Sequence, residues 1–200
     1  MITAIILAAG SARRMGRQKL LLPYRGATLI EHIVGEVLQS GVGACLVVTG
    51  CDSECVGPLV SVKGARQVHN PHHLTGGMLS SVRQGLTEAS DATTAFMVFL
   101  GDQPGISSGF IRVFLDFVES HSTRICVPMF QGKRGHPLYF KSDYKADVMQ
   151  RYDDIGLKGL LRDHEQDVTQ WSCEDPNILV DLDTPEDYTK WMSKHSNLGQ

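Results

Sequence analysis

The chain has 200 residues, of which 42% are hydrophobic and 20% charged, as expected for an ordinary globular protein. Its 19 Lys and Arg against 22 Asp and Glu give a formal net charge of −3, which argues against bulk nucleic-acid binding. No apolar run is long enough to cross a bilayer, so we expect no membrane partner.

The N-terminus leads directly into a strand-like segment without the features of a secretory signal, so we expect a cytoplasmic protein. The five cysteines are odd in number and irregularly spaced, which argues against a disulfide framework. Cys51 and Cys55 can lie one helical turn apart, but no second pair completes a zinc site.

Apolar strands alternate with amphipathic helices in the first part of the chain. Thr28 and Glu31 have the spacing of a capping box at the start of the first helix. In chain order we expect a strand at Ile2–Leu7, a helix at Thr28–Gln39, a strand at Ala44–Thr49, a helix at Ser53–Val60, a strand at Gln67–His69, a helix over Leu79–Ala89, a strand at Ala95–Leu100, a helix containing Ile111–Val118 and a strand at Ile125–Met129. This βαβ alternation predicts a doubly wound, mostly parallel α/β sheet.

The remaining chain is less regular. Thr184 and Pro185 have the residue types of an N-cap and a first helical position, and they predict a final helix. Before it we expect a loop at 132–137, a strand at Leu138–Phe140, helices near Ser142–Gln150 and Leu157–Arg162, and strands at Val168–Trp171 and Ile178–Val180.

The segment after the first strand combines small residues with cations. In order it contains Ala8, Ala9, Gly10, Arg13, Arg14, Gly16, Arg17 and Lys19. Small residues let the backbone approach a ligand and surround phosphate oxygens with N–H groups, while the cations complement a polyanion. The spacing fits neither the three-glycine dinucleotide fingerprint nor a Walker loop, so we expect a triphosphate-binding loop of another kind.

Several short motifs along nearly the whole chain resemble one family. Leu7-Ala8-Ala9-Gly10, Arg14-Met15-Gly16 and Lys19-Leu20-Leu21-Leu22-Pro23 resemble the signature of MobA-like nucleotidyltransferases, which act on molybdopterin-type cofactors. Further matching segments are Asn70-Pro71, Gly76-Gly77-Met78-Leu79-Ser80-Ser81-Val82, Gly101-Asp102-Gln103-Pro104, Gly135-His136-Pro137 and Asp181-Leu182-Asp183-Thr184-Pro185. The first and third motifs are more similar to the molybdenum cofactor cytidylyltransferase branch, because the guanylyltransferase branch usually has Gly where Ala9 stands.

The resemblance implies a Rossmann-like nucleotidyltransferase domain over 1–200. Residues 1–105 would form its nucleotide-binding half, 106–194 its acceptor-binding half and 195–200 a frayed tail. The implied reaction transfers CMP from CTP to a molybdopterin-type molybdenum cofactor and releases pyrophosphate, with Mg²⁺ as cofactor. A molybdenum hydroxylase that receives the product is a candidate partner.

Three residues are the candidate catalytic groups. Asp102 ends a buried strand, where open α/β sheets bind ligands, and the resemblance assigns it to Mg²⁺. Lys19 suits a phosphoryl oxygen, and the Arg14 guanidinium can form two hydrogen bonds to the departing pyrophosphate. Arg13 and Arg17 match no fixed position of the family.

Other site residues follow from the resemblance and from local pattern. One of Asp181 and Asp183 is expected near the metal, because alternate residues of a strand point to opposite faces, and Asp183 is the candidate ligand. His136 is expected to face the acceptor. The candidate nucleotide-binding residues are Leu7, Ala8, Ala9, Gly10, Gly16, Lys19, Gly76, Gly77, Met78 and Ser81.

Three alternatives stay open at this point. GTP or another phosphorylated acceptor can replace the expected substrates on the same fold. A non-catalytic chaperone that binds the pterin cofactor and hands it to a molybdenum hydroxylase would tolerate loss of Lys19 or Asp102, and both are present. An oxidoreductase using NAD or flavin is disfavoured by the missing third glycine and by the lack of an acidic residue after the second strand.

Overall fold

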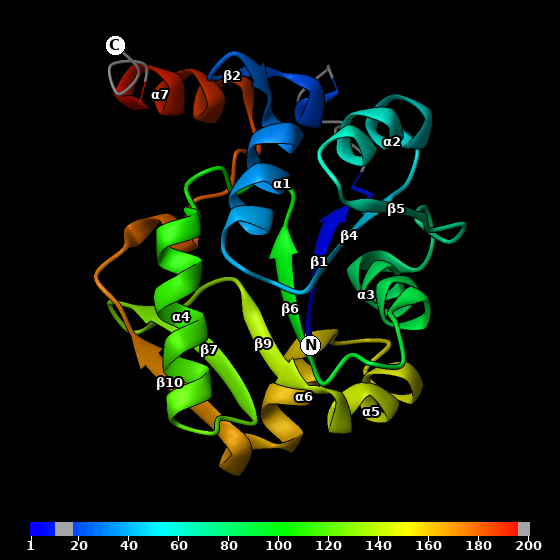
Figure 1. The fold of residues 1–200 in the computed structure, drawn as a ribbon, viewed down its shortest axis with the longest axis vertical. Coiled ribbons are helices and arrows are strands. Elements are labelled where there is room, and N and C mark those ends of the chain that lie inside the picture. The colour runs from blue at the N-terminus through cyan, green and yellow to red at the C-terminus, as the bar shows by residue number, and fades with distance from the viewer. Residues whose placement is uncertain (11–17, 196–200) are drawn as a thin grey trace.

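The computed structural model describes residues 1–10 and 18–195. Its centre is an eight-stranded sheet in the order β10-β7-β9-β6-β1-β4-β5, with β8 paired to β7 (Figure 1). These strands are β1 (Ile2–Ala8), β4 (Ala44–Thr49), β5 (Arg66–His69), β6 (Ala95–Leu100), β7 (Ile125–Phe130), β8 (Lys133–Arg134), β9 (Leu138–Lys141) and β10 (Val168–Ser172). The pairs β1–β4, β1–β6, β4–β5 and β7–β10 are parallel. Strand β9 runs antiparallel to β6 and β7, and β8 runs antiparallel to β7. The predicted mostly parallel sheet is therefore confirmed.

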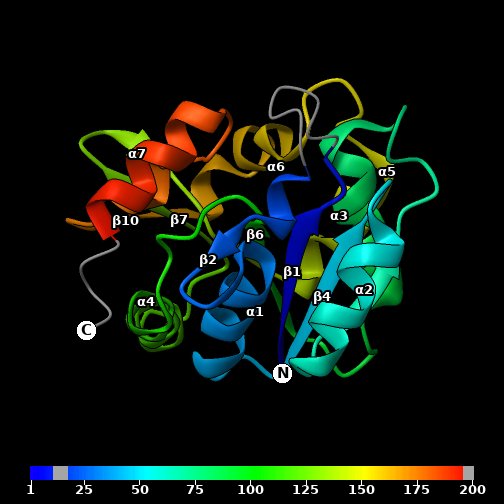
Figure 2. The same cartoon turned by 90° about the horizontal axis from the view of Figure 1, so that it is seen from above.

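Helices cover both faces of the sheet (Figure 2). One face packs against α1 (Leu29–Gln39), α2 (Ser53–Val62) and α4 (Ser108–Ser120), and the other against α3 (Gly77–Glu88), α5 (Lys145–Gln150) and α6 (Leu157–Asp163). Alternate residues of β1 enter the two cores, with Ala4 and Ile6 in one and Ile5 in the other. Because both faces are buried, the central strands are apolar throughout.

The last helix, α7 (Pro185–His195), lies at the end of the molecule toward which β1 and β6 point (Figure 1). Its buried Trp191 belongs to the same core cluster as the buried faces of α1 and α4. The Thr184 hydroxyl accepts from the backbone N–H of Asp187 at 3.1 Å, as the predicted N-cap requires. The capping box at Thr28 and Glu31 is also confirmed, with both reciprocal hydrogen bonds present.

Some local predictions are wrong. The expected strand at Ile178–Val180 is instead the 3₁₀ helix η4 (Pro176–Leu179). The Asp175 side chain accepts from the backbone N–H of Asn177 at 2.9 Å, and Pro176 occupies the first turn, so these helix-start signals outweigh the β-branched residues. The expected helix at Ser142–Gln150 divides into η2 (Ser142–Tyr144) and α5. The sequence did not predict β8, the hairpin of β2 (Pro23–Tyr24) and β3 (Ala27–Thr28), or the 3₁₀ turns η1 (Lys19–Leu21) and η3 (Glu165–Asp167).

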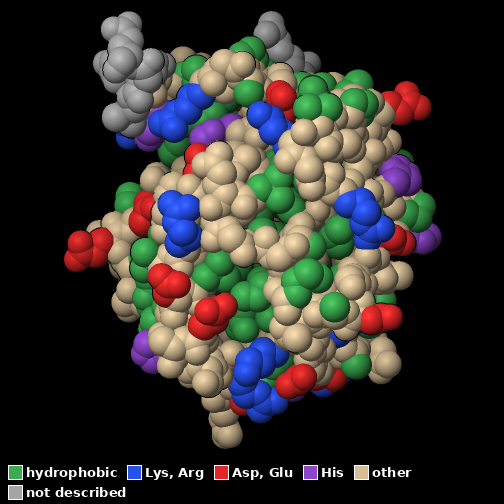
Figure 3. Space-filling model, in the orientation of Figure 1, with side chains coloured by type: hydrophobic (Ala, Val, Ile, Leu, Met, Phe, Trp, Pro, Cys, Tyr) green, Lys and Arg blue, Asp and Glu red, His purple; other side chains and the backbone are tan. Residues whose placement is uncertain are grey.

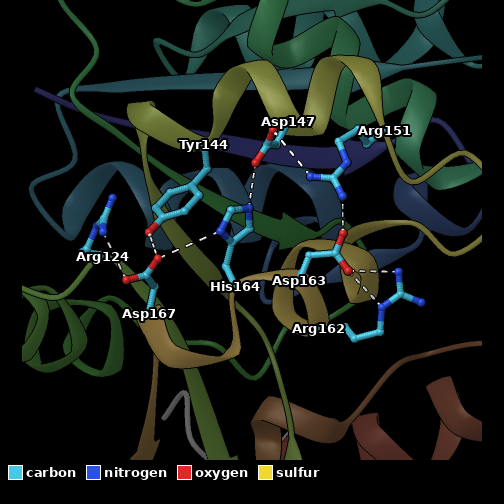
Figure 4. Close-up of polar contacts among 8 residues, drawn as sticks. All are labelled: Arg124, Tyr144, Asp147, Arg151, Arg162, Asp163, His164 and Asp167. Carbon is cyan, nitrogen blue, oxygen red and sulfur yellow. Dashed lines mark hydrogen bonds and ion pairs between the residues drawn. The ribbon is translucent and has the colours of Figure 1, made fainter.

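A polar network ties α5, α6 and η3 together (Figure 4). At its centre, His164 Nε2 lies 2.6 Å from Asp147 Oδ2, and the Tyr144 hydroxyl donates to Asp167 Oδ2 at 2.7 Å. Burial is the larger cause and the hydrogen bond to Asp167 the next, and together they raise the pKa of Tyr144 to about 12. Arg124 pairs with the other oxygen of Asp167 at 3.1 Å. These partners satisfy one another, so we interpret the network as a structural connection.

On the face shown in Figure 3, the Lys and Arg side chains of the described residues are interspersed with Asp and Glu side chains. Within 1–10 and 18–195, no helix has the length and apolar character needed to cross a membrane. All five cysteines are free thiols.

Candidate active site

The candidate site lies at the carboxyl ends of β1 and β6. Strand β4 pairs with one edge of β1 and β6 with the other, so the chain order reverses between β1 and β6, which is where open α/β sheets bind ligands. The Gly101 N–H donates to the Leu7 carbonyl at 2.9 Å. A Cβ on Gly101 would lie only 2.7 Å from that carbonyl oxygen, so glycine lets the turn carrying Asp102 pack against β1.

Three charged side chains meet at this edge. Lys19 Nζ lies 2.8 Å from Asp102 Oδ2 and 3.1 Å from Asp183 Oδ1. The Lys19 side chain is 11% exposed, that of Asp102 27% and that of Asp183 54%, so the cluster opens to solvent on the Asp183 side. The three residues come from η1, from the turn after β6 and from the segment before α7. This arrangement brings together the candidate residues Lys19 and Asp102 and one of the two later acidic candidates, Asp183.

Buried Leu182 decides which of the two later acidic residues reaches Lys19. Its N–H donates to the Asp102 carbonyl at 3.0 Å, and its side chain lies in the core. Asp181 instead accepts from Gln103 Nε2 at 2.7 Å. Burial raises the pKa of Asp181, although the hydrogen bond from Gln103 acts in the opposite direction. Asp183, and not Asp181, therefore shares the site with Asp102.

The residues present fit a divalent metal ion. Asp102 Oδ1 is buried and has no hydrogen-bond partner among the described residues. An unpartnered buried carboxylate oxygen is costly unless a cation binds it. The described residues hold no group of three or more His, Cys, Asp and Glu side chains able to bind a metal. Two carboxylates suit Mg²⁺, which commonly binds one or two carboxylates and takes its other ligands from substrate phosphates and water.

His136 lies close to this cluster. Its backbone N–H donates to the Ile178 carbonyl at 3.2 Å, and its Nδ1 is 3.4 Å from the Val98 carbonyl of β6. Burial lowers the pKa of His136, while the nearby carboxylates of Asp181 and Asp102 oppose this shift. His136 therefore lies on the β9 side of β6, and its contact with an acceptor stays a prediction.

A second loop at the same edge is organised by Asn70, which is 1% exposed. Its side-chain Nδ2 donates to Ser80 Oγ at 2.8 Å and to Ser81 Oγ at 3.0 Å, and its Oδ1 accepts from the His72 N–H at 2.9 Å. Ser81 is itself 4% exposed, so it supports the loop from within and does not face the solvent.

The remaining candidate residues divide into three groups. Leu7, Ala8 and Ala9 are at or just beyond the carboxyl end of β1, with Ala8 and Ala9 buried and Gly10 exposed. Gly76, Gly77 and Met78 are exposed at the start of α3. Arg14 and Gly16, like Arg13 and Arg17, lie outside the described residues.

Sequence reasoning did not identify two residues whose side chains hold segments of this region in place. Gln103 and Asn70 are both buried polar side chains, each holding a neighbouring segment by its amide. Asn70 and Gln103 stood within matching motifs, but neutral amides carry no chemical signal that distinguishes them from turn residues. Only their burial and their partners identify them.

The chain is similar to several known proteins over most of its length. The family model of the MobA-like NTP transferase domain matches residues 4–168. The chain is 31% identical over 194 residues to the nicotine blue oxidoreductase of Paenarthrobacter nicotinovorans, covering 92% of this chain and 93% of that protein. It is 25% identical over 199 residues to the molybdenum cofactor cytidylyltransferase of Escherichia coli K12, covering 98% of both. A crystal structure of Rv0371C from Mycobacterium tuberculosis in complex with manganese superposes with a TM-score of 0.78 at 25% identity, covering 96% of this chain and 98% of that one.

Proposed function

Since this chain belongs to the MobA-like NTP transferase family, we propose that it is a nucleotidyltransferase that moves CMP from CTP to a molybdopterin-type molybdenum cofactor. The observation that carries the proposal is the position of Lys19 between Asp102 and Asp183 beside an unpartnered Asp102 oxygen. A triphosphate and its metal ion need both kinds of charge at one place. The cluster supplies them at the edge of the sheet where ligands of such folds bind.

In this mechanism the chain mainly positions the two substrates and neutralises the negative charge of the triphosphate. Asp102 and Asp183 would hold a divalent ion, which when bound stabilises the negative charge on the triphosphate. Lys19 donates hydrogen bonds from its ammonium group to phosphoryl oxygens, and the backbone N–H groups after β1 surround the same phosphates. An ionised phosphate on the acceptor attacks the α-phosphate, and pyrophosphate leaves. No general base is required, because the attacking group is already deprotonated.

The preference for CTP rests on Ala9. This residue is 6% exposed, and its methyl group adds bulk to the segment beside the triphosphate site. We expect a larger rise in melting temperature with Mg²⁺ and CTP than with GTP, ATP or UTP, because a ligand that binds only the folded state stabilises it. Ala9→Gly is expected to raise the response to GTP relative to CTP. A wild-type response to GTP alone would contradict the CTP assignment while leaving the transferase class intact.

The acceptor would bind on the His136 side of the cluster. A pterin carries amide-like donors and acceptors, which a neutral imidazole can complement. The direct test incubates the protein with Mg²⁺, CTP and molybdenum cofactor and measures pyrophosphate together with the cytidylylated product. Sugar 1-phosphates are tested in parallel, and a preference for them would place the chain in the same class with another acceptor. A product that then activates a molybdenum hydroxylase would identify the partner.

A second candidate is an oxidoreductase, favoured by the 31% identity to nicotine blue oxidoreductase. Such an enzyme needs a nicotinamide or flavin site, whereas the paired carboxylates beside Lys19 suit a metal-bound triphosphate better. An absorbance scan for bound flavin and a titration with NADH and NADPH separate the two candidates. Reduced-nicotinamide oxidation without any pyrophosphate release would favour the oxidoreductase. Binding of molybdenum cofactor without pyrophosphate release and without oxidation of reduced nicotinamide would favour a chaperone role.

A further inference from the structure

A thiol and an imidazole form a pair that the proposed transfer reaction does not use. Cys51 Sγ lies 3.1 Å from His73 Nε2, and His73 Nδ1 lies 2.9 Å from the Asn70 carbonyl oxygen. A carbonyl oxygen can only accept, so Nδ1 carries the proton that it donates to Asn70. In neutral His73 the lone pair of Nε2 then faces the Cys51 thiol, which donates to it.

The surroundings of the other thiols differ. Burial raises the pKa of Cys45 and of Cys126 to about 12 in each case. Cys55 is exposed like Cys51 and lies one helical turn away in α2, but no imidazole is within hydrogen-bond distance of its sulfur among the described residues. Within the described part of the chain, Cys51 is the one exposed thiol beside an oriented imidazole, which is the environment of reactive thiols.

We propose that Cys51 is a nucleophilic thiol, activated by His73, that reacts with soft electrophiles and with small-molecule disulfides. With a disulfide, the thiol proton passes to His73 Nε2 and the Cys51 sulfur attacks one sulfur of the disulfide. A new sulfur–sulfur bond forms as the old one breaks, and the released half leaves as a thiol that takes the proton back from His73. The product is a mixed disulfide on Cys51, with no net oxidation or reduction of the pair of reactants.

The position of Cys51 connects this chemistry to the nucleotide site. The residue before it, Gly50, sits so close to β1 that a Cβ there would lie 2.7 Å from the Ala9 carbonyl oxygen. The residue after it, Asp52, accepts from Gln18 Nε2 at 2.9 Å, next to Lys19. The two chain neighbours of Cys51 therefore lie close to Ala9 and Gln18, which flank the predicted triphosphate loop. This second part of the proposal rests on the proposed function: modification of Cys51 and nucleotide binding oppose each other.

The first experiment measures alkylation rates with iodoacetamide at pH 7 by peptide mass spectrometry, with Cys55 as the internal reference. We expect Cys51 to react about tenfold faster than Cys55, because His73 can accept the proton of the Cys51 thiol as its sulfur attacks. His73→Gln, which removes the imidazole that accepts the thiol proton, is expected to slow the alkylation of Cys51 to the rate of Cys55. The matched control His72→Gln keeps the fast rate. Equal rates at the two cysteines in the wild-type protein, or no effect of His73→Gln, would overturn the proposal.

The second experiment tests the connection to the nucleotide. Treatment with oxidised glutathione is expected to give a mixed disulfide at Cys51 and to weaken binding of CTP with Mg²⁺, and Cys51→Ala abolishes this sensitivity. CTP with Mg²⁺ is expected to protect Cys51 from alkylation. Bound CTP without protection would refute the connection alone. If the protein binds no nucleotide but Cys51 is still alkylated rapidly in a His73-dependent way, the proposed function is refuted and the assignment of the reactive thiol is retained.

Discussion

Replacing Asp102 by Asn removes one negative charge from the cluster around Lys19 and leaves the shape of the side chain unchanged. The Lys19–Asp102 pair is neither surface-exposed nor fully buried, with side chains 11% and 27% exposed. Exposed pairs contribute about 0–1 kcal/mol, and breaking fully buried ones costs about 3–5 kcal/mol, so the lost attraction is worth about 1–2 kcal/mol. Removing the charge also lowers the cost of burying Asp102 Oδ1, which has no hydrogen-bond partner among the described residues. The two effects oppose each other, so we expect the free energy of unfolding to change by only about 1 kcal/mol.

Activity should respond far more strongly than stability. Loss of one group that stabilises transition-state charge costs about a hundred- to a thousandfold in turnover, and Asp102 would also hold the metal. We therefore expect Asp102→Asn to lower pyrophosphate release at least a hundredfold or so and to weaken Mn²⁺ binding by about tenfold or more. Turnover is followed by pyrophosphate release, Mn²⁺ by electron paramagnetic resonance and stability by urea unfolding. Asp116→Asn, at an exposed position of α4, is the matched control.

Wild-type turnover and Mn²⁺ affinity in folded Asp102→Asn would refute the assignment of Asp102. If this variant unfolds instead, the loss of the ion pair with Lys19 outweighs the reduced cost of burying the Asp102 charge. The expected change of about 1 kcal/mol in the free energy of unfolding would then be wrong.

Three further outcomes follow from local geometry. Thr28→Ala removes the capping box with Glu31 and should cost about 1 kcal/mol in urea unfolding, whereas Thr28→Ser should be nearly neutral; equal losses would contradict the cap. Burial lowers the pKa of His136 below 6.5, so the unfolded chain takes up a proton that the folded chain does not. Stability therefore falls as the pH drops below 6.5, and His136→Gln should flatten that fall; an unchanged slope would contradict it. Gln103→Leu leaves half-buried Asp181 without its 2.7 Å donor and should destabilise the fold by about 1–3 kcal/mol; the same unfolding midpoint as wild type would contradict it.

The sequence was sufficient to predict the sheet and most helices. Strand segments buried on both faces are continuously apolar, as in Ala95–Leu100, and helices carry their own start signals, as at Thr28 and Thr184. These signals are local, so a short window of residues contains them. Where two local signals competed, as in the segment after Asp175, the prediction failed because the cap and the proline outweighed β-propensity.

Identifying the catalytic candidates also began with sequence, because strand ends, charge and motif spacing all singled out Lys19 and Asp102. The choice between Asp181 and Asp183 required the tertiary structure. It depends on the burial of Leu182 and on its hydrogen bond to the Asp102 carbonyl, which joins residues 80 positions apart in the chain. The same holds for the Cys51–His73 pair, whose members are 22 residues apart and meet only because β4 and β5 end side by side. Local pattern fixes which residues begin and end each element, whereas contacts between distant segments arise only when the sheet brings its strand ends to one edge.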